Sequence, residues 1–206
     1  MRLVLWRWRN PMSFIDNRLK PLFPNSEFTI DEQGIIKVEV TVDNLITVLT
    51  RLHSELTFES LQTIACADWL EDDILHINYI LYSYTHNQTI FVAIKLPREL
   101  KDDGSKRTVA TIPSVETIWP QANPFERELW EMFGVSVTGH SNLKEFFLED
   151  WQDIPPLRRD FDTLKFVNDN FEFRPGREDA LKVSVERKKV RERKAAEKAA
   201  KEGSDE

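Results

Sequence analysis

The run Ile74-Leu-His-Ile-Asn-Tyr-Ile-Leu-Tyr-Ser-Tyr84 and the run Gln88-Thr-Ile-Phe-Val-Ala-Ile-Lys-Leu96 decide the fold of this chain. Both are rich in β-branched and aromatic residues, and only the turn-like residues 85–87 separate them. Such runs with so short a connection predict two neighbouring antiparallel strands. Pro97 ends the second run, and the charged residues 101–107 predict a solvated loop.

The residues before this pair predict a hairpin, a helix and another strand. Residues 28–30 and 35–40 flank Gly34 and include an alternation of apolar and charged side chains, which predicts the hairpin. Asp43 is placed to cap the helix that follows, and residues 61–67 predict a further strand. The apolar residues of the helix recur at helical spacing and form one stripe: Leu45, Val48, Leu49, Leu52 and Leu56.

The expected fold class is therefore α+β, with a mixed, largely antiparallel sheet covered by helices. An extended C-terminal arm and a charged tail, helical or disordered, follow it. We expect four segments: an N-terminal leader over residues 1–25, the α+β domain over 26–140, a partner-binding arm over 141–176, and the tail over 177–206.

Both ends of the chain allow two interpretations. Residues 1–10 contain three arginines and two tryptophans, which fits either an unordered leader, with Met12 as the biological start, or an anchor to a partner or membrane surface. Residues 177–206 contain ten basic and eight acidic residues. Interleaved acidic residues repel phosphate, so a solvated tail is favoured over a nucleic-acid-binding arm.

Composition limits the function classes. A formal charge of −7 argues against nucleic acid as the main partner. The single cysteine, Cys66, fits a reducing compartment and excludes an iron–sulfur cluster held by this chain's own thiolates. Its apolar surroundings favour a buried structural thiol over a nucleophile. No apolar run approaches the roughly 20 residues that span a bilayer.

Motifs for catalysis are missing from the sequence. There is no glycine-rich nucleotide fingerprint, phosphate loop or zinc-protease helix, and the four histidines lack metal-ligand spacing. The acidic run Asp68–Asp73 predicts a solvated loop rather than a cation site. These features favour docking over catalysis.

The helix from Asn123 to Gly134 is specified at both ends. Asn123 with Glu126 has the spacing of a capping box, Pro124 suits the first turn, and Gly134 suits a left-handed exit. Phe125, Leu129 and Phe133 lie on one face of it. Upstream, Ser114 is placed to cap a short helix over 115–119.

The triplet Glu126-Arg127-Glu128 lies inside this helix. Successive helical residues point about 100° apart, so at least one charge must meet a partner group at the edge of the packed face. Arg158 and Arg159, which follow two prolines that hold the chain extended, are natural partners for Glu126 or Glu128. Such an ion pair could form within the subunit or between this subunit and another. A catalytic carboxylate pair is disfavoured, since no histidine, cysteine or metal cluster accompanies it.

Two blocks of sequence then resemble a known family. The first contains Glu126-Arg127-Glu128, Trp130-Glu131, Phe133-Gly134 and Gly139-His140 in order; the second contains Leu143, Trp151 and the run from Pro156 to Phe161. This order resembles the C subunit of respiratory complex I, the 30-kilodalton-type component of NADH:quinone oxidoreductase. Ser141-Asn142 and Ile154-Pro155 depart from the family's pattern.

The resemblance implies a cofactor-free scaffold subunit of a proton-translocating oxidoreductase. NAD(H), FMN, iron–sulfur clusters and quinone would lie on other subunits, and the expected neighbours are the hydrogenase-like D subunit and the cluster-bearing B subunit. The implied location is peripheral, on the cytoplasmic face of the inner (plasma) membrane, or on the matrix side in a mitochondrion. The equivalent subunit of a membrane-bound nickel–iron hydrogenase, or of an F420H2- or ferredoxin-linked relative, is the alternative.

On this resemblance we expect no catalytic, cofactor-binding or metal-binding residue, and an interface role for the signature. The expected interface residues are Glu126, Arg127, Glu128, Trp130, Phe133, Gly134, Gly139, His140, Trp151, Pro156, Leu157, Arg158, Arg159, Asp160 and Phe161.

Overall fold

The structure is a computed structural model that describes residues 11–171, 176, 182 and 185–189. The chain divides into two compact units, Met1–Phe161 and Asp162–Glu206. The interpretations of residues 1–10 and most of the prediction for the charged tail lie outside the described residues.

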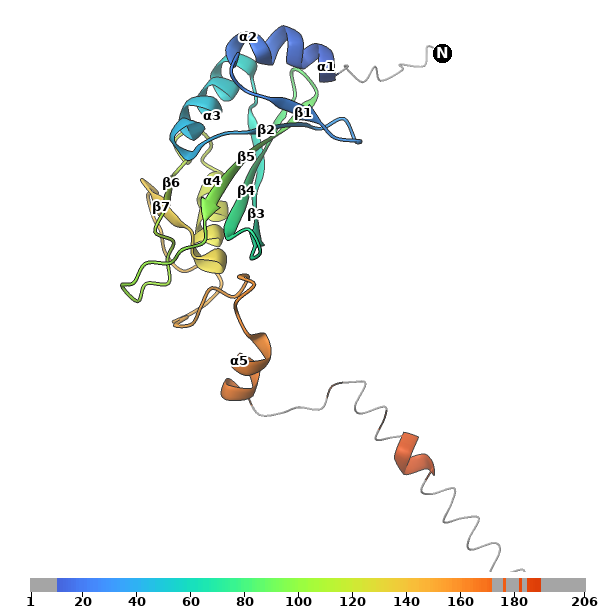
Figure 1. The fold of residues 1–206 in the computed structure, drawn as a ribbon, viewed down its shortest axis with the longest axis vertical. Helices are drawn as coiled ribbons and strands as arrows, with labels where there is room; N and C mark the ends of the chain where they lie inside the picture. Colours follow the sequence, from blue (N-terminus) through green and yellow to red (C-terminus); the bar gives the residue numbers. More distant parts are fainter. Residues whose placement is uncertain (1–10, 172–175, 177–181, 183–184, 190–206) are drawn as a thin grey trace, which may run out of the picture. The chain divides into compact units, whose positions relative to one another are not determined.

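A five-stranded mixed sheet forms the centre of the first unit, in the order β1-β2-β5-β4-β3 (Figure 1). Its pairs are antiparallel except for the parallel pair of β2 and β5. The predicted hairpins are confirmed, and so is the α+β class. The strands are β1 (Phe28–Ile30), β2 (Ile36–Glu39), β3 (Ser60–Trp69), β4 (Ile74–Ser83) and β5 (Gln88–Pro97).

The core lies on one face of this sheet. Alternate residues of β4, from Leu75 to Ser83, are buried, and they pair in register with buried residues of β5. Helix α3 (Val42–Leu56) covers this face with the predicted stripe, since Leu45, Leu49 and Leu52 are fully buried. Burying each such leucine contributes on the order of 2 kcal/mol.

The start of α3 differs from the prediction. Thr41, with extended backbone angles, precedes the helix, and the Asn44 amide donates to Thr41 Oγ1 at 3.1 Å. Asp43 therefore does not cap the helix; it lies in the first turn, where its negative charge interacts favourably with the helix dipole.

The first described residues are helical and belong to the core. They form α1 (Pro11–Phe14), the π-helical turn η1 (Ile15–Leu19) and α2 (Lys20–Leu22). The assignment of residues 11–25 to a leader is wrong, because apolar side chains of this segment pack into the domain. Those buried are Phe14, Ile15, Leu19 and Phe23.

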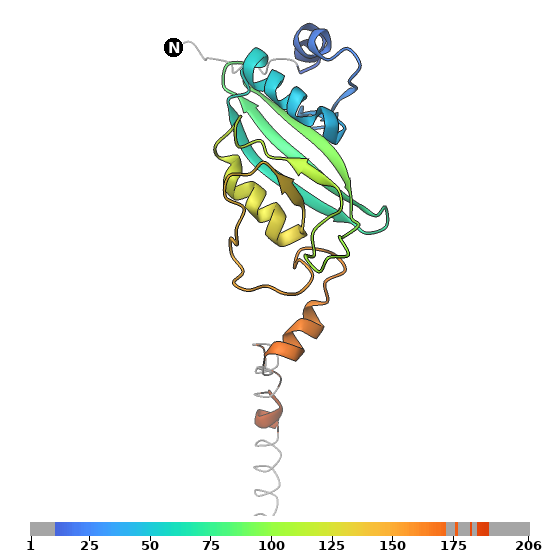
Figure 2. The same cartoon turned by 90° about the vertical axis from the view of Figure 1, so that its left-hand side faces the viewer.

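A second layer lies on the same side of the sheet as α3 (Figures 1 and 2). It consists of α4 (Ala122–Glu128), which continues into the π-helical turn η2 (Leu129–Phe133), and of the parallel strands β6 (Thr111–Pro113) and β7 (Ser136–Thr138).

The segment predicted as an extended arm divides in two. Residues up to Phe161 belong to the first compact unit, so this unit continues past the predicted boundary at residue 140. In the second unit, α5 (Thr163–Asn170) was not predicted; Asp162 caps it by accepting from the Lys165 N–H at 2.9 Å. None of the helices in the described residues has the length and apolar character needed to cross a bilayer.

Candidate functional site

Gly134 ends the signature helix in the predicted left-handed conformation, with φ 74°. A Cβ at this position would lie 2.6 Å from the Lys106 carbonyl oxygen and 2.9 Å from Pro155 Cγ. Its own carbonyl accepts from the Thr108 N–H at 2.8 Å. Only glycine combines this φ with so close an approach of three chain segments.

Asn123 does not cap the helix, so the predicted capping box is wrong. Its amide donates instead to Glu116 Oε1 at 3.0 Å. Glu116 also accepts from the Ser141 N–H at 3.0 Å and from the Ser141 hydroxyl at 2.7 Å. These bonds, led by the one from the Ser141 backbone, lower the pKa of Glu116 to about 2. Sequence reasoning missed Glu116, since nothing local links it to residue 141.

Glu126 is fully buried and pairs with neither predicted arginine. It accepts from the Ser114 hydroxyl and from the Val115 N–H, both at 2.6 Å. Residues 115–119, predicted as a short helix, instead form a turn in which the Trp119 N–H donates to the Val115 carbonyl at 3.0 Å. Burial raises the pKa of Glu126. The carboxylate fastens this turn to α4.

His140 is held by two backbone groups. Its Nδ1 accepts from the Asn142 N–H at 3.0 Å, so the proton lies on Nε2, which donates to the Asn123 carbonyl at 3.1 Å. The same Nε2 atom lies 4.0 Å from Glu126 Oε2. Gly139, with φ 79°, supplies the bend before it.

The helix also binds the loop that follows His140. The Arg127 guanidinium donates to the carbonyls of Lys144, at 3.1 Å, and Glu145, and lies 4.9 Å from the centre of the Phe146 ring. Glu131, which is buried, accepts from the N–H groups of Phe146 at 2.6 Å and Phe147 at 2.7 Å. Two successive N–H groups on one carboxylate fix the path of this loop.

Trp130 and Glu128 occupy the remaining faces of the helix. The Arg107 guanidinium lies 3.9 Å from the centre of the Trp130 ring, and burial lowers the pKa of Arg107. Glu128 is half-buried and, within the described part of the chain, makes no ion pair with Arg158 or Arg159.

A buried ionic cluster lies where β3 and β5 end. The Asp68 carboxylate accepts two bonds from the Arg98 guanidinium, one of them 3.0 Å long, and their side chains are 1% and 7% exposed. Hydrogen bonding to Asp68 raises the pKa of Arg98. Asp160 lies 3.0 Å from Arg98. The solvated-loop prediction is thus wrong for Asp68, because an arginine 30 residues away neutralises it.

Arg158 joins this cluster from the second signature block. Its guanidinium donates to the Arg98 carbonyl at 2.9 Å and to the Phe133 carbonyl at 3.4 Å, and it lies 3.3 Å from Asp160. Arg158 is 4% exposed. Within the chain, the predicted pairing of an arginine with Glu126 or Glu128 is wrong, because Glu126 accepts its hydrogen bonds from Ser114 and Val115. A pair between Glu128 and an arginine of another subunit stays a prediction.

The backbone around Arg158 is turned, not extended. The Arg158 N–H donates to the Pro155 carbonyl at 3.1 Å and the Phe161 N–H to the Arg158 carbonyl at 3.2 Å. Arg158 is buried and Arg159 is exposed, and these turns, not an extended strand, place the two side chains differently. The Arg159 N–H donates to Asp68 Oδ2 at 2.7 Å while the residue is exposed.

Further residues of the second signature block are Trp151, Pro156, Leu157 and Phe161. The Trp151 indole donates to the Ile154 carbonyl at 3.0 Å, and its ring lies 5.6 Å from that of Phe161. Pro156 is half-buried, whereas Leu157 is 51% exposed. The structure thus brings most of the predicted interface residues together, but within the chain.

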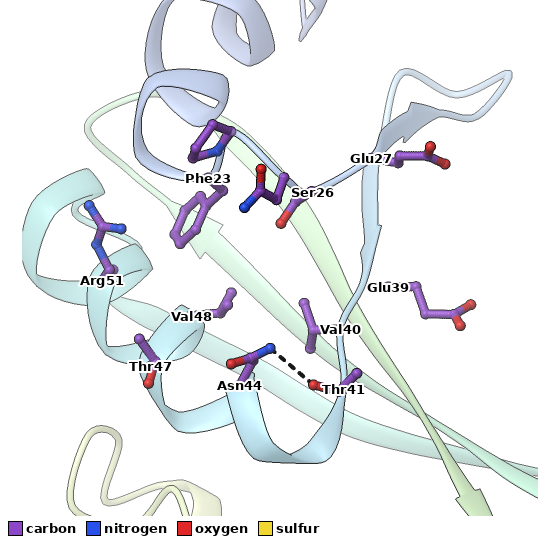
Figure 3. Close-up of a pocket in the computed structure, with 12 residues that line it drawn as sticks. Phe23, Ser26, Glu27, Glu39, Val40, Thr41, Asn44, Thr47, Val48 and Arg51 are labelled. Carbon is purple, nitrogen blue, oxygen red and sulfur yellow. Dashed lines mark hydrogen bonds between the residues drawn. The ribbon is translucent and has the colours of Figure 1, made fainter.

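Two of the surface hollows formed by the described residues lie beside α3 and beside the signature helix. One, of about 650 Å³, lies between α3, the end of β2 and the loop before β1; Figure 3 shows Phe23, Asn44 and Arg51 on its walls. The other, of about 610 Å³, lies beside Trp130 and residues 144–149. Neither gathers a set of catalytic groups. In the described ranges no group of three or more His, Cys, Asp or Glu residues is placed to hold a metal ion. Burial raises the pKa of Cys66 to about 12, which makes it a poor nucleophile.

Comparison with known proteins gives consistent results. Residues 38–167 match the model of the family described as respiratory-chain NADH dehydrogenase, 30 Kd subunit. The C subunit of the NADH-quinone oxidoreductase of Moorella thermoacetica is 30% identical over 69% of this chain and 90% of its own length. The corresponding C subunit of Rhizobium rhizogenes is 34% identical over 65% of this chain and 64% of its own length. The chain therefore spans slightly less than two-thirds of the rhizobial relative.

Two solved structures share the fold. A chain from the membrane-bound sulfane sulfur reductase, an archaeal respiratory membrane complex, superposes with a TM-score of 0.67 and 23% identity, over 81% of this chain and 96% of that chain. A trypsin-resistant fragment of Nqo5 gives a TM-score of 0.51 and 18% identity, over 65% of this chain and 99% of the fragment.

Proposed function

The chain belongs to the family of the 30 kDa subunit of respiratory-chain NADH dehydrogenase, and on that basis we propose that it is a scaffold subunit of a membrane-associated NADH:quinone oxidoreductase. In this role it binds no cofactor itself and supports the quinone-reducing module, whose electron transfer is coupled to proton translocation. The complex would carry NAD(H), FMN, iron–sulfur clusters and quinone on other subunits.

The observation that supports this proposal best is the internal hydrogen bonding of buried carboxylates in and beside the signature. Glu126, Glu131 and Asp68 are buried, and each accepts hydrogen bonds from a backbone N–H as well as from any side-chain partner. In each of these buried carboxylates both oxygens accept hydrogen bonds from the chain itself, so the carboxylate fixes neighbouring chain segments. This is the arrangement of a rigid structural subunit.

The proposed partners are the hydrogenase-like D subunit and the cluster-bearing B subunit. Arg159 and Leu157 are exposed on the first unit, and α5 exposes Leu164 and Val167. These residues provide a cation and apolar side chains that stay exposed in the chain by itself. Contact with partners through them would hold the chain at the cytoplasmic face of the membrane, or at the matrix face in a mitochondrion.

The equivalent subunit of an energy-converting membrane-bound nickel–iron hydrogenase, or of an F420H2- or ferredoxin-linked relative, is the alternative. The superposition on a chain of an archaeal respiratory membrane complex shows a shared fold and does not separate the two proposals. The sequence relatives described above are subunits of NADH-quinone oxidoreductases, which supports the first proposal.

The test is to purify the tagged chain from detergent-solubilised membranes and identify what accompanies it by mass spectrometry. We expect D- and B-type subunits together with NADH-oxidising flavoprotein subunits. Recovery with nickel-binding subunits instead would select the alternative, and recovery of the chain alone would contradict both proposals. An untagged strain controls for adventitious capture.

A further inference from the structure

The outward face of β3, β4 and β5 differs from an ordinary water-facing sheet surface. We define the open face as the outward side chains of β3 from Thr63 to Trp69, of β4 from Ile74 to Tyr82 and of β5 from Thr89 to Pro97. Helices α3 and α4 lie on the other face of the sheet (Figure 1). No helix among the described residues of the first unit covers the open face.

The open face carries almost no charge. An antiparallel sheet with one solvated face normally alternates apolar side chains inward with polar side chains outward. Here Lys95 is the one formally charged residue among those outward positions, and its ammonium is paired with Glu39 at 2.8 Å. At the border, Lys37 pairs with Asp31 at 3.2 Å and lies 5.8 Å from the centre of the Phe91 ring.

Uncharged side chains occupy the rest, most of them apolar or aromatic, with Thr63, Asn78 and Thr89 as polar members. Trp69 is 48% exposed and stacks on His76 with ring centres 5.3 Å apart. Ile80 and Phe91, opposite one another on neighbouring strands, are half-buried. Between these two groups, Ala65, which is exposed, and Ala93, which is buried, flank Asn78 in one cross-strand row. An apolar patch poor in charge is the composition found at the centre of interfaces.

We infer that the open face is a docking surface for an apolar, uncharged surface of another subunit of the oxidoreductase complex. The inference rests on the proposed function, because membership of a complex supplies a different chain as the occupant. The charges agree with this occupant: the chain is strongly acidic overall, yet the lysines in and beside the open face are already neutralised, so the partner needs no opposite charge there.

The size of the face is suited to one partner. Three strands about 4.8 Å apart and about 33 Å long give a footprint on the order of 500 Å². A standard interface buries roughly 800 Å² on each partner, so the open face with its borders provides most of one such interface. At its centre, the bond of 3.1 Å between the Asn78 amide and His76 Nδ1 leaves the Asn78 carbonyl and His76 Nε2 as groups that orient the partner.

Cysteine labelling in the assembled complex tests this surface. Ala67 is exposed on the open face, and Thr50 is exposed on α3, so Ala67→Cys and Thr50→Cys form a matched pair. The natural Cys66 gives a low background because burial suppresses its thiolate. Maleimide should label both variants rapidly in the purified full-length chain. In the complex, Ala67→Cys should react at least tenfold more slowly than in the free chain, and Thr50→Cys at an unchanged rate.

The outcomes separate the inference from the proposed function. Unchanged labelling of Ala67→Cys in a complex that contains the oxidoreductase subunits would overturn the open face as an interface while leaving the proposed function intact. Protection in the purified chain, together with a dimeric mass, would assign the face to a second copy and also overturn the inference. Ala67→Glu, compared with Thr50→Glu, gives a second readout: we expect at least a tenfold loss of assembled complex and an unchanged melting temperature of the chain.

Discussion

The signature region and the open face of the sheet present opposite combinations of charge and exposure. The signature, from Asn123 to Phe161, is rich in charged side chains, yet Glu126, Glu131 and Arg158 are buried within the chain. The open face has almost no charge, yet most of its side chains are only half-buried or exposed and no helix of the described residues of the first unit covers it. Charge density in a sequence thus does not by itself mark an interface, because a charged group that meets an internal partner is unavailable to another subunit.

The difference has a physical origin. A carboxylate or guanidinium loses its hydrogen bonds to water when it is buried, and hydrogen bonds within the protein must replace them. Each buried ionic group therefore fixes the positions of the groups that bind it. An exposed apolar face has no such internal requirement; the gain from covering it is realised only when another surface arrives. The signature is therefore a brace that holds the domain, and the open face is a surface available for assembly.

If the signature is a brace, breaking the ionic cluster should have the largest effect. Arg98→Ala leaves the Asp68 carboxylate buried without its cation, which should lower the free energy of unfolding by about 3–5 kcal/mol. Urea denaturation of the purified chain measures this. Lys20→Ala, which removes one partner of an exposed ion pair, is the control and should cost less than about 0.5 kcal/mol. Equal effects of the two changes would show that the buried ionic cluster, which Arg158 and Asp160 of the signature join, does not stabilise the domain.

The next effect concerns the junction that Gly134 makes between three segments. Gly134→Ala should lower the free energy of unfolding by about 2–4 kcal/mol, since the left-handed backbone is strained and the new Cβ meets the Lys106 carbonyl. Gly139→Ala is the matched control: its φ is also positive, but no atom lies within 4 Å of the added Cβ. Differential scanning calorimetry should show a smaller loss for it, and identical losses would mean that the close approach is absent.

Acid titration gives a smaller effect and separates Glu126 of the signature from Glu116, which lies outside it and binds its residues Asn123 and Ser141. The pKa of Glu116 is lowered in the folded chain to about 2, so its stabilisation is present above the unfolded value of about 4.3 and is lost as pH falls toward 2. The pKa of Glu126 is raised by burial, so the folded state holds this proton more tightly and loses stability as pH rises above about 4.3.

Glutamine variants of both residues check these signs through urea unfolding between pH 2.5 and 7. Glu116→Gln should flatten the stability curve on the acid side, and Glu126→Gln should flatten its decline on the neutral side. The same response from both variants would show that the two carboxylates do not have opposite environments.

The strands and α3 could be predicted from the sequence because their signals are local. Runs such as Ile74–Ser83 alternate between the two faces of the sheet, and the leucines of α3 recur at helical spacing. The left-handed exit at Gly134 was also predictable, since it depends on one residue and its neighbours.

The partners of the charged residues could not be predicted in this way. Asp68 accepts hydrogen bonds from Arg98, Glu116 accepts them from Ser141, and Glu126 accepts them from residues 114–115. Each pairing depends on where the turns place the partner segment. Asn123 was expected to cap its own helix, but its side-chain amide donates instead to the charged carboxylate of Glu116. The open face was missed for a different reason: alternation shows that a strand has two faces but not which one the helices cover.

A comparison of Arg158→Ala with Arg159→Ala tests the central claim most directly, because these adjacent residues differ in what they contact. Arg158 is buried on carbonyls of its own chain, and Arg159 is exposed and makes no side-chain ion pair within the described residues. Melting of the purified chain and the amount of assembled complex in native gels are measured for both variants. We predict that Arg158→Ala lowers the melting temperature, and assembly with it, whereas Arg159→Ala lowers assembly at an unchanged melting temperature. An unchanged melting temperature for Arg158→Ala, with loss of assembly alone, would show that Arg158 serves the interface and would contradict the account of the signature as an internal brace.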